Sequence, residues 1–227
     1  MSLYPLTDAP VLSLRLAVVY RFRDIFTNTP VRTRLTVSIP SRKWTAYASP
    51  SDGTYRFVEP LTGAGDTPVP RPFDVLVESD TGDYANYEPF QVELPRTVPP
   101  GPPQVSSYLI EKFLWPTRRF RPPPGETAVV GRVTSDADKN VAGLKVYLYT
   151  QAGPDPPAGT PYTYTDGNGD FLYRLPKIKA QLDGTGNVVP VTLNARVFDG
   201  ALAVTIDPIA IPNVAPGSVI FQQFQQT

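Results

Sequence analysis

The chain contains no cysteine and no histidine among its 227 residues. Disulfide bonds and thiolate metal sites are therefore excluded, and so is any mechanism that needs an imidazole as base, acid or ligand. This excludes the Ser-His-Asp triad, the Cys-His proteases and most zinc enzymes. An enzyme would have to work with paired carboxylates, lysine or tyrosine. We therefore expect a protein that is not an enzyme and that holds no cofactor.

The chain also has no net charge at pH 7, because 21 Lys and Arg residues balance 21 Asp and Glu residues. Nucleic-acid-binding proteins usually carry a basic surface, so we expect no nucleic-acid partner. No apolar run approaches the roughly 18 residues of a membrane span. The start of the chain lacks the basic segment of a secretory signal. We expect cytoplasmic synthesis without a signal, and incorporation into a particle assembled in the cytoplasm stays open.

Proline, in contrast, is in excess, at 28 of 227 residues. Its usual share is about 5%. Proline is poorly tolerated inside helices and central strands, so this composition favours short strands, turns and extended connectors. Apolar residues still make up 41% of the chain, which is enough to bury a core.

Apolar and polar residues alternate in both halves of the chain, which is the period of a half-buried strand. The alternation covers residues 12–18, 35–39 and 55–57 in the first half, and the second half repeats the same order of events. No 11-residue window has convincing helical spacing. We predict an all-β protein of two tandem Ig/transthyretin-like β-sandwiches that arose by duplication of one module.

Residues 95–124 lie between the halves and hold nine prolines. Such a segment is stiff and extended, and we expect that it does not join the centre of a sheet. Its middle, 105–116, is too apolar for a free linker, so it packs as a strap or short helix against one module or docks on a partner. The predicted domains are a first sandwich at 1–97, a proline-rich strap at 98–124 and a second sandwich at 125–227.

The stretch "WPTRRFRPPP" is a candidate partner-binding patch, because Trp and Arg are enriched in interface hot spots. The alternative is an extended strap whose aromatic rings pack down while its arginines stay in water. Its residues are Trp115, Arg118, Arg119, Phe120 and Arg121.

A second aromatic group lies in "DYANYEPF". It could form a platform for stacking carbohydrate, or it could be a strand end with one inward ring. Its residues are Tyr84, Tyr87 and Phe90.

The second half resembles the carboxypeptidase regulatory-like domain, through "VVGRVTSDADKNVAGLKVYLY" followed by "YTYTDGNGDFLYRLP". The resemblance covers about residues 127–212 and implies a transthyretin-like β-sandwich without catalytic activity of its own. Residues 10–96 fit the same pattern more loosely. The matching positions of the second half are Gly131, Val133, Gly143, Val146, Thr165, Asp166, Gly169 and Phe171.

The stretch "TDGNGDF" allows two interpretations. Asp166, Asn168 and Asp170 alternate as the first oxygen ligands of a calcium loop would. However, Phe171 stands where such a loop needs glycine, and Lys177 stands where it needs glutamate. The resemblance instead implies a turn with Gly167 and Gly169 at positive φ and Phe171 in the core. The turn is favoured, and binding of a weak cation there stays open.

These patterns together predict a structural or adaptor protein that contacts other subunits of a large assembly, with self-association open. The openings "LSLRLAVVYRF" and "FLWPTRRFRPPPGETAVVGRV" resemble accessory proteins near the cap of phage tail-like contractile injection systems. The alternative is a surface or secreted module that binds carbohydrate or a host protein.

Overall fold

The computed structural model describes residues 14–60, 69–95, 108–135, 139–151, 153, 155–178, 181–199 and 204–225. Strands dominate these ranges, and the sheets pair into sandwich-like arrangements, so the prediction of an all-β protein is confirmed. One short 3-10 helix, η1 (Pro40–Arg42), follows a strand. Among the described residues there is no helix with the length and apolar character needed to span a bilayer.

The chain forms two compact units that interleave along the sequence. Unit 1 draws on residues 1–22, 36–77 and 89–112, and unit 2 draws on 23–35, 78–88 and 113–227. Three of the described strands, β1 (Leu14–Asp24), β6 (Arg71–Ser79) and β9 (Leu109–Pro116), begin in unit 1 and end in unit 2. A fourth, β2 (Leu35–Ile39), begins in unit 2 with its first residue and continues in unit 1. The contiguous segments 1–97, 98–124 and 125–227 are a different division and stay a prediction.

Unit 1 is built from two sheets. One has the order β4 (Tyr47–Ser49), β5 (Thr54–Pro60), β1, β9, β7 (Tyr84–Ala85), of which β7 belongs to unit 2. The other has the order β3 (Trp44–Thr45), β2, β6, β8 (Phe90–Leu94). The alternation predicted at 35–39 is present, because Leu35, Val37 and Ile39 are buried.

In β1 the predicted alternation is wrong beyond Leu16. The register with β5 shifts between Leu16 and Val18, and residues 17–20 are all buried. A β-bulge of this kind changes which face the following side chains point to. Residues 12 and 13 lie outside the described ranges.

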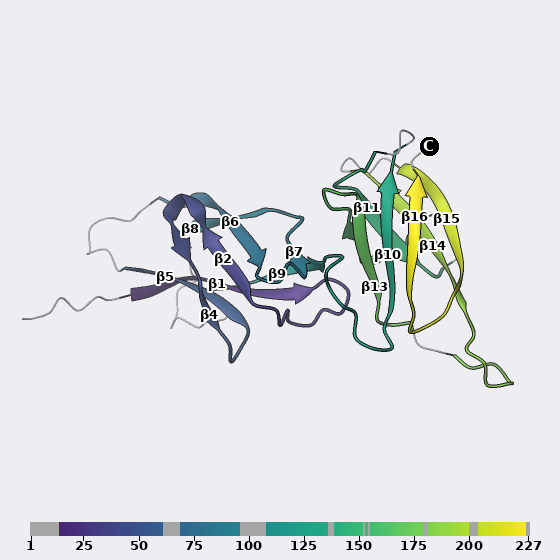
Figure 1. Ribbon diagram of the computed structural model, residues 1–227. Coiled ribbons are helices and arrows are strands. Elements are labelled where there is room, and N and C mark those ends of the chain that lie inside the picture. Colours follow the sequence, from purple (N-terminus) through teal and green to yellow (C-terminus); the bar gives the residue numbers. More distant parts are fainter. Residues whose placement is uncertain are drawn as a thin grey trace, which may run out of the picture. The chain divides into compact units, whose positions relative to one another are not determined.

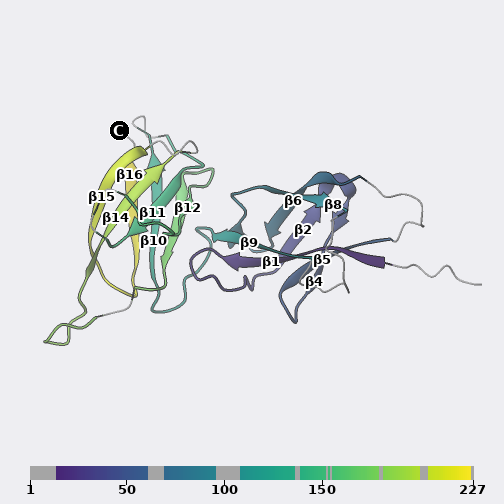
Figure 2. The same cartoon turned by 180° about the vertical axis from the view of Figure 1, so that it is seen from behind.

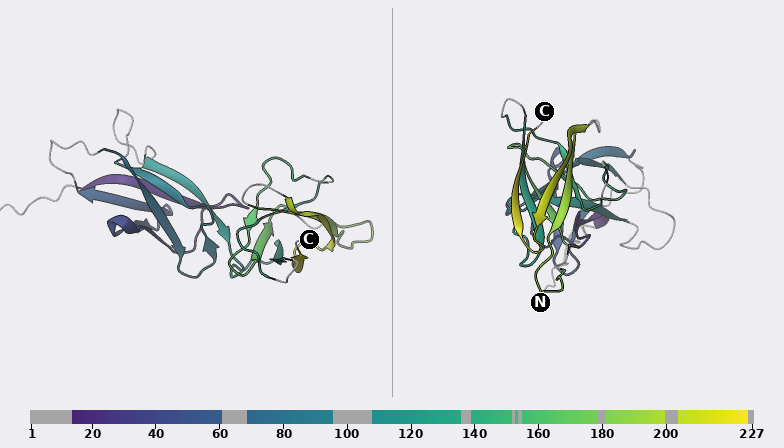
Figure 3. Two further views of the ribbon diagram at one scale, coloured as in Figure 1. Left: turned by 90° about the horizontal axis from the view of Figure 1, so that it is seen from above. Right: turned by 90° about the vertical axis from the view of Figure 1, so that its right-hand side faces the viewer.

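Unit 2 contains a seven-strand sandwich. The first sheet has the order β13 (Asp170–Leu175), β10 (Thr127–Thr134), β16 (Val219–Gln225). The second has the order β12 (Thr163–Tyr164), β11 (Lys145–Tyr149), β14 (Val191–Phe198), β15 (Val204–Val214). Figures 1 and 2 view these layers from opposite sides, and the right-hand view of Figure 3 shows them from a third direction. The core includes Val129, Val146, Phe171, Leu193 and Phe224.

Two segments from the first half of the sequence complete unit 2. The turn after β1 sends Phe26 into the sandwich core, where its ring lies 4.7 Å from that of Tyr173. The second segment carries β7 (Tyr84–Ala85), which pairs with the end of β9 through Pro116 and Trp115. Residues that are far apart in sequence are therefore packed into one core.

The middle of the predicted strap is a strand, which corrects the expectation that it stays out of a sheet centre. In the sheet order β9 lies next to β1 on one side and β7 on the other. The nine prolines of 95–124 all lie outside the stretch 109–115, so their effect does not reach it. Residues 109–115 contain no proline, so each of their backbone N–H groups is able to join a ladder.

Candidate functional site

A buried ionic cluster joins the start of unit 2 to its sandwich. Arg174 on β13 donates from Nη1 to Asp24 Oδ2 at 2.5 Å, and from Nε and Nη2 to the two carboxylate oxygens of Glu126 at 2.5 and 2.8 Å. Asp24 is only 1% exposed and Arg174 only 5%. Two carboxylates therefore share one guanidinium away from water, and Asp24 lies 150 residues from Arg174 in the sequence.

The remaining groups around this cluster are also satisfied. Asp24 Oδ1 accepts the backbone N–H of Phe26 at 2.8 Å, and Oδ2 accepts the hydroxyl of Tyr84 at 2.9 Å. The ring of Phe120 lies 4.4 Å from the Arg174 guanidinium. Burial by itself would lower the pKa of Arg174, but the hydrogen bonds of Glu126 and the charge of Asp24 raise it overall. Burial and Asp24 raise the pKa of Tyr84 above its usual value. The guanidinium and the phenol thus stay protonated, as a structural contact requires.

An aromatic cluster surrounds Trp115 at the end of β9. The indole N–H donates to the carbonyl oxygen of Tyr162 at 3.0 Å, and the Trp115 side chain is almost fully buried. The rings of Tyr87, Tyr162 and Tyr164 have centroids 5.5 to 6.2 Å from that of Trp115. Burial, with the charge of Asp166 as a second cause, raises the pKa of Tyr87 to about 12.

Glu88 holds the outer edge of this aromatic cluster. Its Oε1 atom accepts the hydroxyls of Tyr162 and Tyr164 at 2.6 and 2.8 Å. Lys145 lies over both tyrosine rings, with its Nζ atom 3.9 Å from the same oxygen. Burial, followed by the hydrogen bond to Glu88, raises the pKa of both tyrosines. The carboxylate therefore accepts hydrogen bonds from two phenols that keep their protons. It positions these side chains and does not act as a base.

A second carboxylate, that of Asp170, is clamped by two arginines. Arg118 donates from Nη1 to Oδ2 at 2.6 Å, and Arg132 donates from Nε to Oδ1 at 2.7 Å. These three residues line an open groove of about 380 Å³, together with Phe221 and Gln223. The hydrogen bond of Arg132 and the hydrogen bond and charge of Arg118 outweigh burial and lower the Asp170 pKa below 3.8.

This lowered pKa predicts an acid-dependent loss of stability. A depressed folded-state pKa contributes stability above the unfolded-state pKa, and that contribution is lost as the pH falls through the folded-state pKa. Below about pH 4, the unfolding free energy of the natural chain should therefore fall more steeply than that of Asp170→Asn. Urea unfolding of both proteins at a series of pH values measures this. Parallel curves would show that Asp170 is not the group responsible.

The "TDGNGDF" stretch is a turn in the structure. Asp166 Oδ1 accepts the backbone N–H groups of Asn168 and Asp170 at 2.8 and 3.0 Å, while the Asp170 carboxylate points to its two arginines. The two acidic side chains thus have separate partners and do not converge as cation ligands. Only Gly169 has positive φ, at 72°. The expectation for Gly167 is wrong, because Asp166 closes the turn with ordinary backbone angles at that position.

The predicted partner-binding residues have different positions. Trp115 is internal, Arg118 holds Asp170, and Phe120 packs against Arg174 and, at 5.4 Å between centroids, against Tyr84. The side chain of Arg119 lies over Gly82. Arg119 and Arg121 are the members exposed to solvent without a described buried partner. Docking at the patch stays a prediction, and a partner would meet these two arginines first.

The three aromatic residues considered for carbohydrate do not share one cluster. Tyr84 contacts Asp24 and Phe120, whereas Tyr87 contacts Trp115. Phe90 belongs to unit 1, where its ring lies 5.5 Å from that of Tyr20. Spacing in the sequence did not reveal these separate partners, because residues 84–90 cross from one unit to the other.

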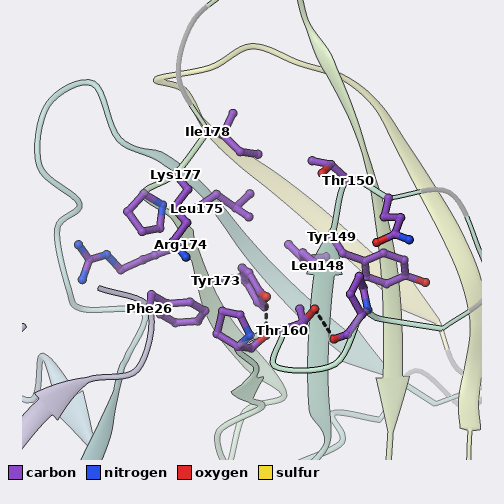
Figure 4. A pocket seen from close by; sticks show the side chains of 14 residues that line it. Phe26, Leu148, Tyr149, Thr150, Thr160, Tyr173, Arg174, Leu175, Lys177 and Ile178 are labelled. Atoms are coloured by element: carbon purple, nitrogen blue, oxygen red, sulfur yellow. Dashed lines mark hydrogen bonds between the residues drawn. The ribbon is translucent and has the colours of Figure 1, made fainter. Parts of the chain in front are cut away.

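An apolar pocket of about 290 Å³ opens at one end of the sandwich (Figure 4). Phe26, Leu148 and Tyr173 line it, and the Tyr173 hydroxyl donates to the carbonyl oxygen of Pro161 at 2.5 Å. Its charged lining residues are Arg174, which is bound to Asp24 and Glu126, and the exposed Lys177. The pocket can accept an apolar group, and it brings no acid–base pair together.

Sequence analysis missed Asp24, Arg174, Glu126 and Glu88, the residues that hold the clusters together. Each is a single charged residue in a loop or strand, and no spacing links it to its partner. The one available signal was Arg174 inside the apolar strand "FLYRL", because a charge placed among core residues requires a buried partner.

The fold and these sites define a β-sandwich protein with buried ionic and aromatic clusters. No known protein family and no curated protein matches the chain. Among solved structures, the TIE protein of Bacillus anthracis is similar at 12% identity and a TM-score of 0.31, over 92% of this chain and 33% of that one. Chlorocatechol 1,2-dioxygenase from Pseudomonas putida is similar at 11% identity and 0.31, over 45% of this chain and 60% of that one.

The shaft pilin SpaA from Lactobacillus rhamnosus GG is similar at 10% identity and a TM-score of 0.27, over 94% of this chain and 98% of that one. The chain thus spans about a third of the TIE protein and three fifths of the dioxygenase. At these TM-scores the similarities assign neither a family nor an activity.

Proposed function

We propose that this chain is a non-catalytic structural or adaptor protein that works through protein–protein contacts in a large assembly. The observation that supports this most is how the buried ionisable groups are used. Asp24, Arg174 and Asp170 each bind opposite charges that lie 38 to 150 residues away. Such groups hold segments together, whereas a catalytic group must face a substrate.

The finer proposal is an accessory role near the cap of a phage tail-like contractile injection system. It rests on the sequence resemblance of the two module openings. A protein with this role is part of a particle far heavier than its own 24.9 kDa. Sedimentation of a native lysate through a sucrose gradient tests the role, and electron microscopy of the heavy fraction identifies the particle. Recovery in the light fractions alone would contradict assembly.

Charge reversal at the exposed arginines makes this experiment specific. Arg119→Glu combined with Arg121→Glu should move the chain from the heavy to the light fractions, because both side chains are exposed and rim charges guide association. Arg32→Glu combined with Lys139→Glu is a matched control, since it changes the charge equally at two other exposed positions of unit 2. Equal behaviour of the two variants would exclude the patch as the contact.

The second candidate function is a surface or secreted module that binds carbohydrate or a host protein. It is supported by three partly exposed aromatic residues, Tyr147 on β11, Phe198 on β14 and Tyr162 just before β12. The ring of Tyr147 lies 5.4 Å from each of the other two rings. Sugars stack on such aromatic surfaces. A glycan array probed with the natural chain and with Tyr147→Ala tests it, and absence of any signal from the natural chain would remove it.

A further inference from the structure

No strand pairs with the outer edge of β16 in the part of the chain that the structure describes, although the side-chain amide of Gln222 donates to the carbonyl oxygen of Gln223 at 3.2 Å. β16 runs parallel to β10 at the end of its sheet (Figure 1). The backbone N–H of Ala128 donates to the carbonyl oxygen of Ser218, so even-numbered residues of β16 point their backbone groups at β10. Because these directions alternate along a strand, Val219, Phe221 and Gln223 turn theirs outward.

This edge also lacks the features that usually protect an edge strand. Its sequence, "VIFQQFQ", has no charge and no proline over seven residues. The edge strand of the other sheet of unit 2, β15, carries Asp207, Pro208 and Pro212, and β12 is only two residues long. Natural proteins place charges, proline or very short strands at edges to prevent pairing with other chains. An unprotected edge of this length is expected where pairing occurs.

An apolar row of side chains runs across the three strands of this sheet and ends at a solvent-exposed residue of β16. Leu172 on β13, Val130 on β10 and Phe221 on β16 are cross-strand neighbours. Leu172 and Val130 are buried, whereas Phe221 is 75% exposed. The rows on either side are Asp170–Arg132–Gln223 and Arg174–Ala128–Val219. The apolar row therefore needs one further neighbour on the open side of Phe221.

We propose that two copies of this chain pair through β16 as antiparallel strands, with Phe221 opposite Phe221 of the second copy. A two-fold axis at this residue continues the row from Leu172 through both phenylalanines to Leu172 of the second copy. The same register places Gln223 opposite Val219. The strand carries no charge, and Arg132 is neutralised by Asp170 in its own chain, so no like charges meet. A strand that pairs with itself must satisfy this condition.

Sedimentation equilibrium of the purified full chain tests the pairing. We expect a dimer of twice 24.9 kDa at high concentration. In Phe221→Lys the dissociation constant should be at least about tenfold higher, because a large apolar contact is lost and like charges are brought together. Gln223→Pro should have the same effect, since it removes an outward N–H while leaving the ladder with β10 intact. Leu182→Lys changes another exposed apolar residue of unit 2 and should leave the dimer unchanged.

The absence of cysteine allows a direct test of the register. Opposite residues in an antiparallel hydrogen-bonded pair have Cα atoms about 5.5 Å apart, within the range of a disulfide. Phe221→Cys should therefore form a covalent dimer under mild oxidation. Gln225→Cys should not, because its two copies would lie about 27 Å apart along the strands. A natural chain that is monomeric at all concentrations, a dimer that survives Phe221→Lys and Gln223→Pro, or equal cross-linking at both positions would overturn the proposal.

Discussion

Replacing Arg174 with methionine is expected to lower the free energy of unfolding by about 3–5 kcal/mol, the usual cost of removing one partner of a buried ion pair. The substitution keeps most of the side-chain volume and removes the guanidinium. Asp24 and Glu126 would then lose their shared partner, and Asp24 would remain a buried carboxylate held only by Tyr84 and backbone N–H groups. The turn that follows Asp24 and the turn that precedes β10 and contains Glu126 should therefore loosen together.

Urea unfolding measures this change, with the fluorescence of the two tryptophans, Trp44 and Trp115, as the signal. Arg56→Met is the matched control, because Arg56 forms a 2.6 Å ion pair with Asp52 at the surface and such pairs contribute about 1 kcal/mol or less. A double-mutant cycle with Asp24→Asn then isolates the coupling between Arg174 and Asp24. A loss in Arg174→Met no larger than in Arg56→Met would show that the buried cluster is not what holds unit 2 together.

The strands of this fold were predictable because their signal is local. Alternation identified residues 35–39, and the turn before Phe171 was recognised together with its destination in the core. Each of these features depends on residues within a few positions of one another. The expectation that residues 95–124 stay out of a sheet centre was wrong at β9, because proline excludes only its own position from a ladder. The stretch 109–115 between the prolines is free to pair.

The contacts between distant segments were not predictable, because nothing in a single sequence links their partners. No pattern in the sequence marks Asp24, and its partner Arg174 is 150 positions away. For Trp115 the sequence left two interpretations open, a docking residue or a ring packed inward, and the structure shows the second, with its N–H donating to a carbonyl 47 residues further on. A buried indole needs such an acceptor, but which acceptor it finds is decided by packing. The candidate sites therefore depend on tertiary structure more than the fold does.

Replacing Gly169 with alanine is expected to lower the free energy of unfolding by about 2–4 kcal/mol, from two separate causes. Gly169 has φ of 72°, a left-handed conformation that disfavours any Cβ. A Cβ there would also lie 2.5 Å from the carbonyl oxygen of Val133 and 3.1 Å from the nitrogen of Val141. Both neighbours are backbone atoms, so the strain cannot be relieved by a side-chain rotation.

Gly167→Ala provides the control within the same turn. Gly167 does not have positive φ, and a Cβ built there has no neighbour within 4 Å, so its unfolding free energy should stay within about 0.5 kcal/mol of the natural chain. Thermal and urea unfolding of the two variants side by side separate the interpretations of "TDGNGDF". If the stretch is only a turn before a strand, its stability depends on Gly169 and not on Gly167, and added calcium does not change the unfolding free energy. If both variants lost stability equally, or if calcium restored Gly169→Ala, the stretch would have to be treated as a cation loop, and the separate partners of Asp166 and Asp170 would need another explanation.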